Sequence, residues 1–414
     1  MSRLLDVLAP PRFGRGFRLL LASSWTSNLG DGIALAAGPL LVASKTDHEF
    51  LVALAALLQW APPLIFGVWA GALTDRLDRR LIIITVDLLR SLVLALLAAA
   101  VAFNAAPIAL VLVAMFLLGT AEVFADNTTS TLLPMLVSRD DLAIGNARLQ
   151  TGFVTINQLL APPIGALLFT VGQFIPFAAQ ALIGVLAVIL IARLRLPPHG
   201  RAPDQARPLW HDIVEGFRWT WHHAAVRTLV LTILIFNVTF GAAWSVLVLY
   251  ATEHLGLGNV GFGLVTTVTA AGGLVGTVSY GWLTRRISLG NVMRIGLIIE
   301  TLTHLVLALT SSPYVAMPVF FIFGAHAFIW GTTSITIRQR AVPTELQGRV
   351  GAVNLVGVYG GLVVGAAIGG VIAQRWGVTA PFWFAFVGSA VFVVLIWAQL
   401  SHIAHDDDLA GVTH

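Results

Sequence analysis

The sequence has no cysteine and little charge for its length. The absence of cysteine from the 414 residues excludes disulfide bonds and thiol chemistry. Charged residues make up 11% of the chain, whereas a soluble domain carries them at about a quarter of its positions. The chain also lacks a phosphate-binding loop, a nucleophile elbow and the ligand spacing of a zinc site. These absences argue against a soluble protein and predict no enzyme activity, no cofactor and no bound metal.

Apolar residues are correspondingly abundant. They make up 57% of the chain, and the mean hydropathy is +0.87. Backbone in lipid must hydrogen-bond within its own segment or barrel, and the apolar runs have the length of helices and not of barrel strands. The sequence therefore predicts an all-α polytopic membrane protein. We expect twelve transmembrane helices, at about residues 17–43, 50–73, 81–103, 107–127, 145–169, 174–194, 228–250, 260–283, 290–310, 313–337, 348–373 and 379–400.

Positive charge lies in alternate loops. The side that holds the N-terminus carries Arg3, Arg12, Arg15, Arg18, Arg76, Arg79, Arg80, Arg139, Arg148, Arg285, Arg286, Arg294, Arg338, Arg340 and Arg349. The opposite side carries only Lys45 and Arg375. By the positive-inside rule, both termini are expected in the cytoplasm and the chain in the plasma (inner) membrane. Arginines facing anionic lipid also account for the pI near 10.1, so no nucleic-acid partner is predicted.

The longest polar stretch divides six spans from six. We expect a six-helix half at residues 1–194, a cytoplasmic linker at 195–227, a second half at 228–401 and a cytoplasmic tail at 402–414. Within the linker, helical spacing places five apolar residues on one face: Trp210, Ile213, Val214, Phe217 and Trp221. This helix either lies on the inner leaflet or packs beneath the helix bundle.

The two halves repeat weakly. A shift of 210 residues aligns residues 71–76 with 281–286, and a shift of 204 aligns 161–166 with 365–370. Parallel six-helix repeats are an architecture of secondary transporters, with substrate sites near the midplane between the halves. We therefore predict two six-helix pseudo-repeats.

A charged loop, GALTDRLDRR at residues 71–80, lies between the second and third predicted spans. It resembles the signature loop of the major facilitator superfamily, G-x-x-x-D-R-x-G-R-R, except that Asp78 replaces the usual glycine. Stretches at residues 27–31, 133–147, 213–218 and 339–350 resemble the macrolide, multidrug and enterobactin exporter branch. The resemblance covers nearly the whole chain and implies the major facilitator fold.

The loop is expected to act as a latch on the cytoplasmic side. Gly71 would let helices approach closely, and Asp75 would accept hydrogen bonds from the start of a facing helix, the eleventh. Arg76, Arg79 and Arg80 would bridge to Asp78, Asp141 or other nearby carboxylates. The second copy has Arg285 where the first has Asp75, so we expect a one-sided latch.

Two positions depart from the antiporter pattern. The Gly-Pro-x-x-Gly-Gly motif of superfamily antiporters reads APPIGA at residues 161–166, where alanine still permits close helix contact. The fourth span lacks the arginine that many antiporters carry, so the proton relay attached to it cannot be transferred to this chain.

Asp31 is the leading candidate for proton or cation coupling. It lies about fourteen residues into the first span, near the midplane of the bilayer. A buried ionisable group in a membrane is costly, which makes it a functional candidate, although a packing role with a hydrogen bond to Asn28 or a neighbour is the alternative. Asn28 in the same span is a candidate residue of the substrate cavity, and the same region of the second half offers Asn237 and Trp244 as cavity residues but no acid.

Other ionisable residues occur in pairs along predicted helices. Glu122 and Asp126 share one helix face and could accept protons, although Asp126 lies close enough to the helix end to be simply solvated. Asp87 and Arg90 are three residues apart, which favours a structural pair.

The second half has its own ionisable candidates. Glu300 and His304 are four residues apart, so they form either a structural pair, which the spacing favours, or a pH switch. His326 and Trp330 lie one turn apart and are candidates for the cavity lining.

Together these features predict a secondary active transporter. We expect a monomeric, proton-coupled antiporter that exports amphipathic small molecules or drugs by alternating access, with protons and membrane lipid as its other partners. The alternatives are an exporter of one natural product, such as a siderophore, and a lipid translocator.

Overall fold

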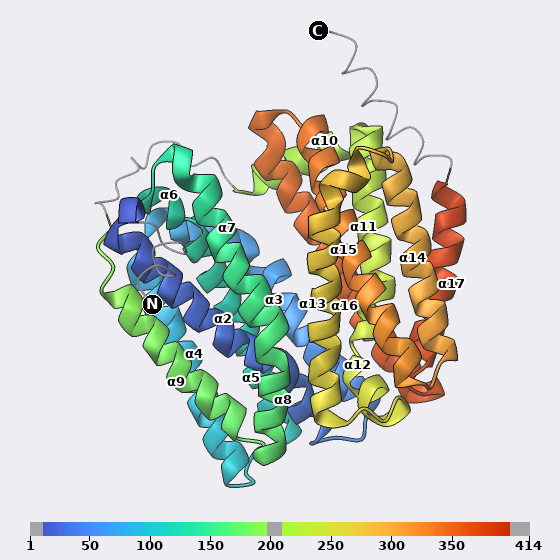
Figure 1. Ribbon diagram of the computed structural model, residues 1–414, viewed down its shortest axis with the longest axis horizontal. Helices are drawn as coiled ribbons and strands as arrows, with labels where there is room; N and C mark the ends of the chain where they lie inside the picture. The colour runs from blue at the N-terminus through green and yellow to red at the C-terminus, as the bar shows by residue number, and fades with distance from the viewer. Residues whose placement is uncertain (1–10, 197–208, 398–414) are drawn as a thin grey trace. The chain divides into compact units, whose positions relative to one another are not determined.

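The computed structural model describes residues 11–196 and 209–397, apart from a few side chains, and these residues form helices without strands (Figure 1). The helices before the linker are α2 (Gly14–Ala43), α3 (Glu49–Arg76), α4 (Arg79–Ala102), α5 (Ile108–Ser130), α6 (Leu133–Leu136), α7 (Leu142–Gly152), η3 (Phe153–Leu160), α8 (Ala161–Val171) and α9 (Ile175–Ala192). The helices after it are α10 (Leu209–His222), α11 (Ala224–Trp244), α12 (Leu247–Leu249), α13 (Gly258–Thr284), α14 (Leu289–Leu309), α15 (Pro313–Ala341), α16 (Gln347–Trp376) and α17 (Ala380–Ile396). The described part of each predicted span lies on one of these helices or on a succession of them.

Ten of the described helical segments are long and apolar enough to cross a membrane. The other two predicted spans lie on α2, which has 30 residues with a polar stretch at residues 23–31, and on α17, a shorter apolar helix of 17 residues. The prediction of an all-α polytopic membrane protein is confirmed.

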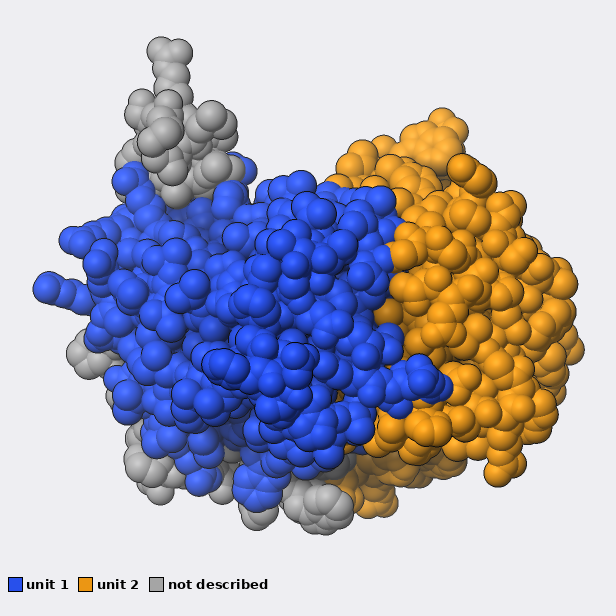
Figure 2. All heavy atoms as spheres, turned by 90° about the horizontal axis from the view of Figure 1, so that it is seen from below, with its two compact units in different colours: residues 1–47, 61–205, 259–267 blue, residues 48–60, 206–258, 268–414 orange. Residues whose placement is uncertain are grey.

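The chain forms two compact units, which Figure 2 colours separately. Unit 1 comprises residues 1–47, 61–205 and 259–267, and unit 2 comprises residues 48–60, 206–258 and 268–414. The first part of α3 thus belongs to unit 2 and the first part of α13 to unit 1. The predicted halves stay a prediction, and the predicted tail at 402–414 lies outside the described residues.

Close backbone contact joins α2 to η3 and α8 in unit 1. A Cβ atom on Gly32 would lie 2.4 Å from the carbonyl oxygen of Asn157, and one on Gly165 would lie 2.3 Å from that of Ile33. Only glycine permits such an approach without a shift of the backbone. Ala161 and Ala166, which replace the motif glycines, are completely buried. The APPIGA motif therefore makes the close helix contact expected of it.

Unit 2 repeats this contact between α11 and α16. A Cβ atom on Gly365 would lie 2.3 Å from the carbonyl oxygen of Val238, and one on Gly369 would lie 2.2 Å from that of Ala242. The 204-residue shift found in the sequence relates Gly165 to Gly369. The weak sequence repeat therefore corresponds to the same type of helix contact in each unit.

The linker helix α10 has a packed face and an exposed face. Gly216 faces the start of α16, where its Cβ would lie 2.6 Å from the carbonyl oxygen of Arg349, and Glu215 pairs with that arginine at 2.8 Å. Phe217 and Trp221 are 57% and 52% exposed, with ring centroids 6.0 Å apart. One face thus packs on the bundle, while contact of the aromatic face with lipid stays a prediction. The side chains of Trp210 and Ile213 lie outside those described.

Candidate functional site

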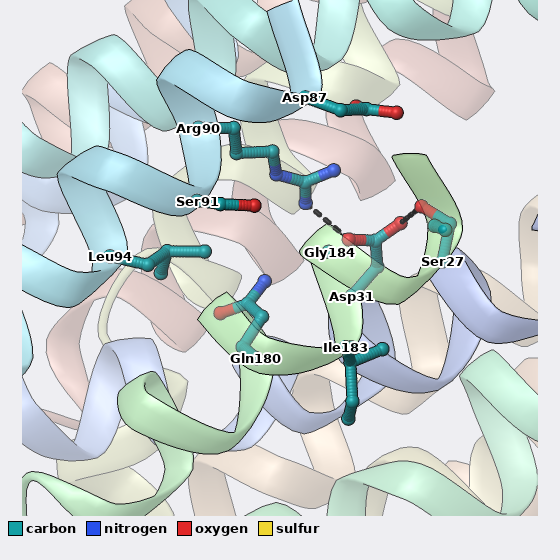
Figure 3. A pocket seen from close by; sticks show the side chains of 11 residues that line it. Ser27, Asp31, Asp87, Arg90, Ser91, Leu94, Gln180, Ile183 and Gly184 are labelled. Carbon is teal, nitrogen blue, oxygen red and sulfur yellow. Dashed lines mark hydrogen bonds and ion pairs between the residues drawn. The ribbon is translucent and has the colours of Figure 1, made fainter. Parts of the chain in front are cut away.

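An ion pair between α2 and α4 lies at the centre of the candidate site in unit 1 (Figure 3). An Nη atom of Arg90 donates to one carboxylate oxygen of Asp31, and Ser27 Oγ donates to the other at 3.3 Å. Ser27 and Asp31 are one turn apart on α2, so both side chains face α4. The side chains of Arg90 and Asp31 are 11% and 24% exposed. The pair is therefore largely shielded, although water can still reach Asp31.

The partners of this pair differ from those suggested by the sequence. The amide of Asn28 donates to the backbone oxygen of Ser24 at 2.8 Å, while the neighbouring Ser27 donates to Asp31, so the packing alternative for Asp31 stays open. Asp87 interacts electrostatically with Arg90, but the ion pair is formed by Asp31. The long arginine side chain extends from α4 to the neighbouring helix, which spacing along α4 alone could not reveal.

Three more acids surround the pair. Asp87 is buried on α4, while Glu122 and Asp126 are exposed on α5. All three interact electrostatically with Arg90. Four carboxylates thus share one guanidinium, and their exposure falls from α5 inward to Asp87.

Three of the four acids, Asp31, Asp87 and Asp126, line a small cavity in unit 1. Its wall includes Ser24, Asn28, Asp31, Asp87, Arg90 and Asp126. The cavity confirms no function by itself, but it brings Asn28, one of the predicted cavity residues, beside the candidate coupling acids. Within the described residues, no group of three or more His, Asp or Glu side chains is placed to hold a metal ion.

Neutral polar side chains complete the site, and the sequence analysis missed them. The Nε of Arg90, the Oγ of Ser91 and the Oε1 of Gln180 are buried without a hydrogen-bond partner among the described residues. Figure 3 shows Ser91 and Gln180 beside the guanidinium, on α4 and α9. Gly184 leaves room for Ser91, since a Cβ there would lie 2.4 Å from its Oγ. Buried polar atoms are nearly always satisfied, so this niche is equipped to bind a polar group or water.

Unit 2 contains a second ionisable cluster with different pairing. His326 Nε2 lies 3.5 Å from Glu300 Oε2, whereas His304 is completely buried and neither of its ring nitrogens has a hydrogen-bond partner among the described residues. The predicted Glu300–His304 pair is therefore replaced by a Glu300–His326 pair between α14 and α15. Sequence spacing within α14 could not show which side chain α15 brings to Glu300.

Aromatic side chains surround this second cluster. Trp244 lies edge-on to His304, with centroids 5.9 Å apart, and packs against Phe240 and Phe323 at 4.4 and 4.7 Å. Phe323 in turn lies edge-on to His326 at 6.0 Å. Trp244 is therefore part of an aromatic core.

The remaining cavity candidates of unit 2 also lie at helix contacts. Asn237 donates to the backbone of its own helix at 2.7 Å and packs beside Gly361. Trp330 packs beside Gly296 on α14. Their exposure to a substrate stays a prediction.

Two arginines of the charged loop at residues 71–80 donate to backbone oxygens in unit 1. Asp78 caps the start of α4 by accepting from the backbone nitrogen of Leu81 at 3.1 Å, which explains an acid where the family usually has glycine. Arg79 donates to the carbonyl of Thr74 at 3.4 Å, and Arg80 donates to that of Ala192.

The expected bridges from the loop arginines to acids stay a prediction. Asp141 pairs with Arg12 at 3.1 Å, and Arg76 is exposed. A Cβ on Gly71 would find no atom closer than 3.9 Å, so this glycine makes no tight contact. The side chain of Asp75 is not among those described, and the latch stays a prediction.

The fold and the buried ionisable groups define a class of protein. The structure resembles a bacterial homologue of the human lysosomal transporter Spinster in an inward-facing conformation, with a TM-score of 0.72 and 14% identity over 96% of this chain and 99% of the other. It also resembles a bacterial homologue of the iron transporter ferroportin, with a TM-score of 0.70 and 17% identity over 92% and 98%. The chain thus has the major facilitator fold of multi-pass membrane transporters.

Sequence comparison identifies the family within that class. The transmembrane secretion effector family matches residues 7–411, and the chain belongs to this family. Its relatives include the multidrug efflux pump Tap of Mycolicibacterium fortuitum, 28% identical over 88% of this chain and 90% of the relative. Macrolide efflux protein A of Streptococcus pyogenes is 23% identical over 85% and 87%. The chain is therefore a transporter of small molecules and not an enzyme.

Proposed function

We propose that this protein is a proton-coupled antiporter that exports amphipathic small molecules, drugs among them, by alternating access. The observation that carries the proposal is the Asp31–Arg90 pair with its surplus of carboxylates. Ionised acids without partners are costly in a membrane protein, so such a cluster is suited to take up protons. The relatives' names as multidrug and macrolide efflux pumps support the substrate class.

Proton binding at Asp31 would change the pairing of Arg90. With Asp31 ionised, the guanidinium holds α2 and α4 together. A proton on Asp31 neutralises the carboxylate, which frees Arg90 to interact with Asp87 and Glu122. Because each pairing favours a different arrangement of the helices, proton occupancy can bias the conformational equilibrium.

The exposure of the acids suggests the proton's route. Asp126 and Glu122 have exposed side chains, Asp31 is partly shielded and Asp87 is buried. We assign the two α5 acids to proton entry and Asp31 to coupling. Asp87 is assigned to tuning the charge of Arg90.

The orientation follows the positive-inside rule. The Arg12–Asp141 pair and the Arg80–Ala192 contact gather the start of α2, the start of α4 and the end of α9 at one end of unit 1. We place this arginine-rich end and both termini in the cytoplasm of a plasma membrane. Residues 71–80 would then form the cytoplasmic latch.

Other cargoes remain distinguishable by experiment. The names of the relatives favour drugs over a siderophore, and a proton-binding cluster favours coupled transport over passive lipid translocation.

We propose that the protein works as a monomer, because each unit carries its own ionisable cluster within one chain.

Transport by the purified protein in liposomes tests the proposal. Radiolabelled erythromycin and ethidium are offered as probes with and without an imposed pH gradient. We expect at least one probe to accumulate with the gradient and to stop accumulating when an ionophore collapses it. Asp47→Asn serves as a control, because Asp47 is an exposed acid in the loop after α2. Accumulation that ignores the gradient would contradict coupling, and a failure to move either probe would contradict drug export.

A further inference from the structure

Unit 2 holds a buried acid–histidine pair that the transport scheme above does not use. Glu300 on α14 and His326 on α15 are 3.5 Å apart, with side chains 12% and 3% exposed. The two residues are 26 positions apart in the sequence and lie on different helices, so the packing of α14 against α15 brings them together. A charged pair buried at this depth costs desolvation, which marks it as a candidate for function.

A glycine positions the histidine. A Cβ on Gly296 would lie 2.9 Å from Nδ1 of His326 and 2.7 Å from Cδ1 of Trp330. Because Gly296 has no side chain, both rings can lie against α14 one turn before Glu300. This placement directs the other ring nitrogen, Nε2, toward the carboxylate. The packing against Gly296 therefore fixes the orientation of His326 toward Glu300.

The pair can hold and release one proton. Imidazole changes charge between about pH 5 and 8, within the physiological range. With a proton on Nε2 the pair is an imidazolium and a carboxylate with no net charge. When the N–H bond breaks and the proton leaves to water, the pair carries one negative charge on Glu300. Because Glu300 is the more exposed partner, its carboxylate offers the path for that proton.

The surroundings contain few competing charges. On α14, His304 is buried against Trp244 and interacts electrostatically with His326, while Arg294 donates to Asn291 and to the carbonyl of Trp397. The titratable groups of the other packed helices are Tyr280 of α13, near Thr333, and Arg227 at the start of α11, while α17 has none between Ala380 and Ile396. Glu300 is thus the one acid facing His326 from the described residues of these helices.

We propose that Glu300 and His326 form a second proton-binding site, located in unit 2, which binds and releases a proton during the transport cycle. His326 carries the proton, Glu300 holds and exchanges it, and His304 stays a neutral packing residue. The proposal rests on the proposed function for its place in a cycle, but the site itself does not depend on the Asp31 cluster. A transporter with one site in each unit can bind two protons.

Nuclear magnetic resonance of the full chain in lipid nanodiscs tests the site directly. The protein is labelled on its histidine rings, and His326→Gln and His304→Gln assign two signals among the 11 histidines. We expect the His326 signal to change with pH. In Glu300→Gln that response should differ measurably from the wild type, because the carboxylate that lies against Nε2 is removed. A His326 signal that does not change with pH, or one whose pH response is unaffected by Glu300→Gln, would overturn the proposal.

Transport measurements test the role of the site in the cycle. With whichever probe the wild type moves, His326→Gln should retain transport but shift or flatten its dependence on pH, while His222→Gln, an exposed histidine of α10, should leave the profile unchanged. An unchanged profile in His326→Gln would refute a role in the cycle. The resonance measurement needs no substrate. It therefore tests the Glu300–His326 site even if the protein proves not to export drugs.

Discussion

The two units share a helix contact but differ in their charge. Gly165 in unit 1 and Gly369 in unit 2 make the same close contact with α2 and α11. Unit 1 holds four acids around one arginine, whereas unit 2 holds Trp244 and its aromatic neighbours with one acid–histidine pair. The repeat therefore preserves the packing of the helices and leaves the polar chemistry free to diverge.

This difference separates scaffold from function. The glycine contacts let two helix backbones approach closely, and both units use them to pack their helices. Buried charge is costly in a membrane and is retained only where it has a role. Unit 1, whose cluster holds more ionisable side chains, is the one that we assign to the main coupling step.

The largest predicted effect comes from removing the arginine of unit 1. Arg90→Gln leaves Asp31, Asp87 and the α5 acids without their shared cation. Breaking a buried ion pair by removing one partner costs about 3–5 kcal/mol, and we expect a loss toward the lower end because Asp31 is partly exposed. Thermal unfolding in detergent measures this loss.

The matching change in unit 2 sharpens the contrast. His326→Gln should destabilise the protein less than Arg90→Gln, because a neutral amide can still donate to Glu300. A double variant, Asp31→Asn with Arg90→Gln, should recover part of the loss. Equal losses in the two units, or no recovery in the double variant, would contradict the assigned difference in charge.

A smaller and equal effect is expected at the shared glycine contact. Gly165→Ala and Gly369→Ala each place a methyl group against a backbone oxygen, which should cost about 1–3 kcal/mol through overpacking. Gly281→Ala is the matched control, since a Cβ there would meet nothing within 4 Å. Thermal unfolding of the three variants compares them, and a strong effect in one unit alone would break the proposed equivalence.

The smallest effect concerns the departure from the family loop. Asp78→Ala removes the cap of α4 and should cost about 1 kcal/mol, whereas Asp78→Gly, which restores the usual family residue, should cost only a few tenths. The difference in melting temperature between these two variants measures the cap. Identical melting temperatures would mean that Asp78 does not cap α4 in solution.

Sequence reasoning found the features that depend on local pattern. Hydropathy placed the spans, the 204-residue shift found the glycine contacts, and Asp31 was identified because it is an acid inside an apolar run. It failed where partners come from distant segments: Arg90 meets Asp31 from 59 residues away, and Glu300 meets His326 across two helices. It also missed Ser91 and Gln180, because neutral polar residues in a membrane helix give no signal of their own.

The central claim is that coupling depends on the acid of unit 1, and one comparison of transport modes tests it most directly. Asp31→Asn is reconstituted in liposomes beside wild type and Asp47→Asn. Two rates are measured for the same probe: accumulation driven by a pH gradient, and exchange of labelled for unlabelled probe without a gradient. We predict that Asp31→Asn retains exchange and loses gradient-driven accumulation by at least about tenfold, while Asp47→Asn keeps both. Gradient-driven accumulation at the wild-type level in Asp31→Asn would contradict the account.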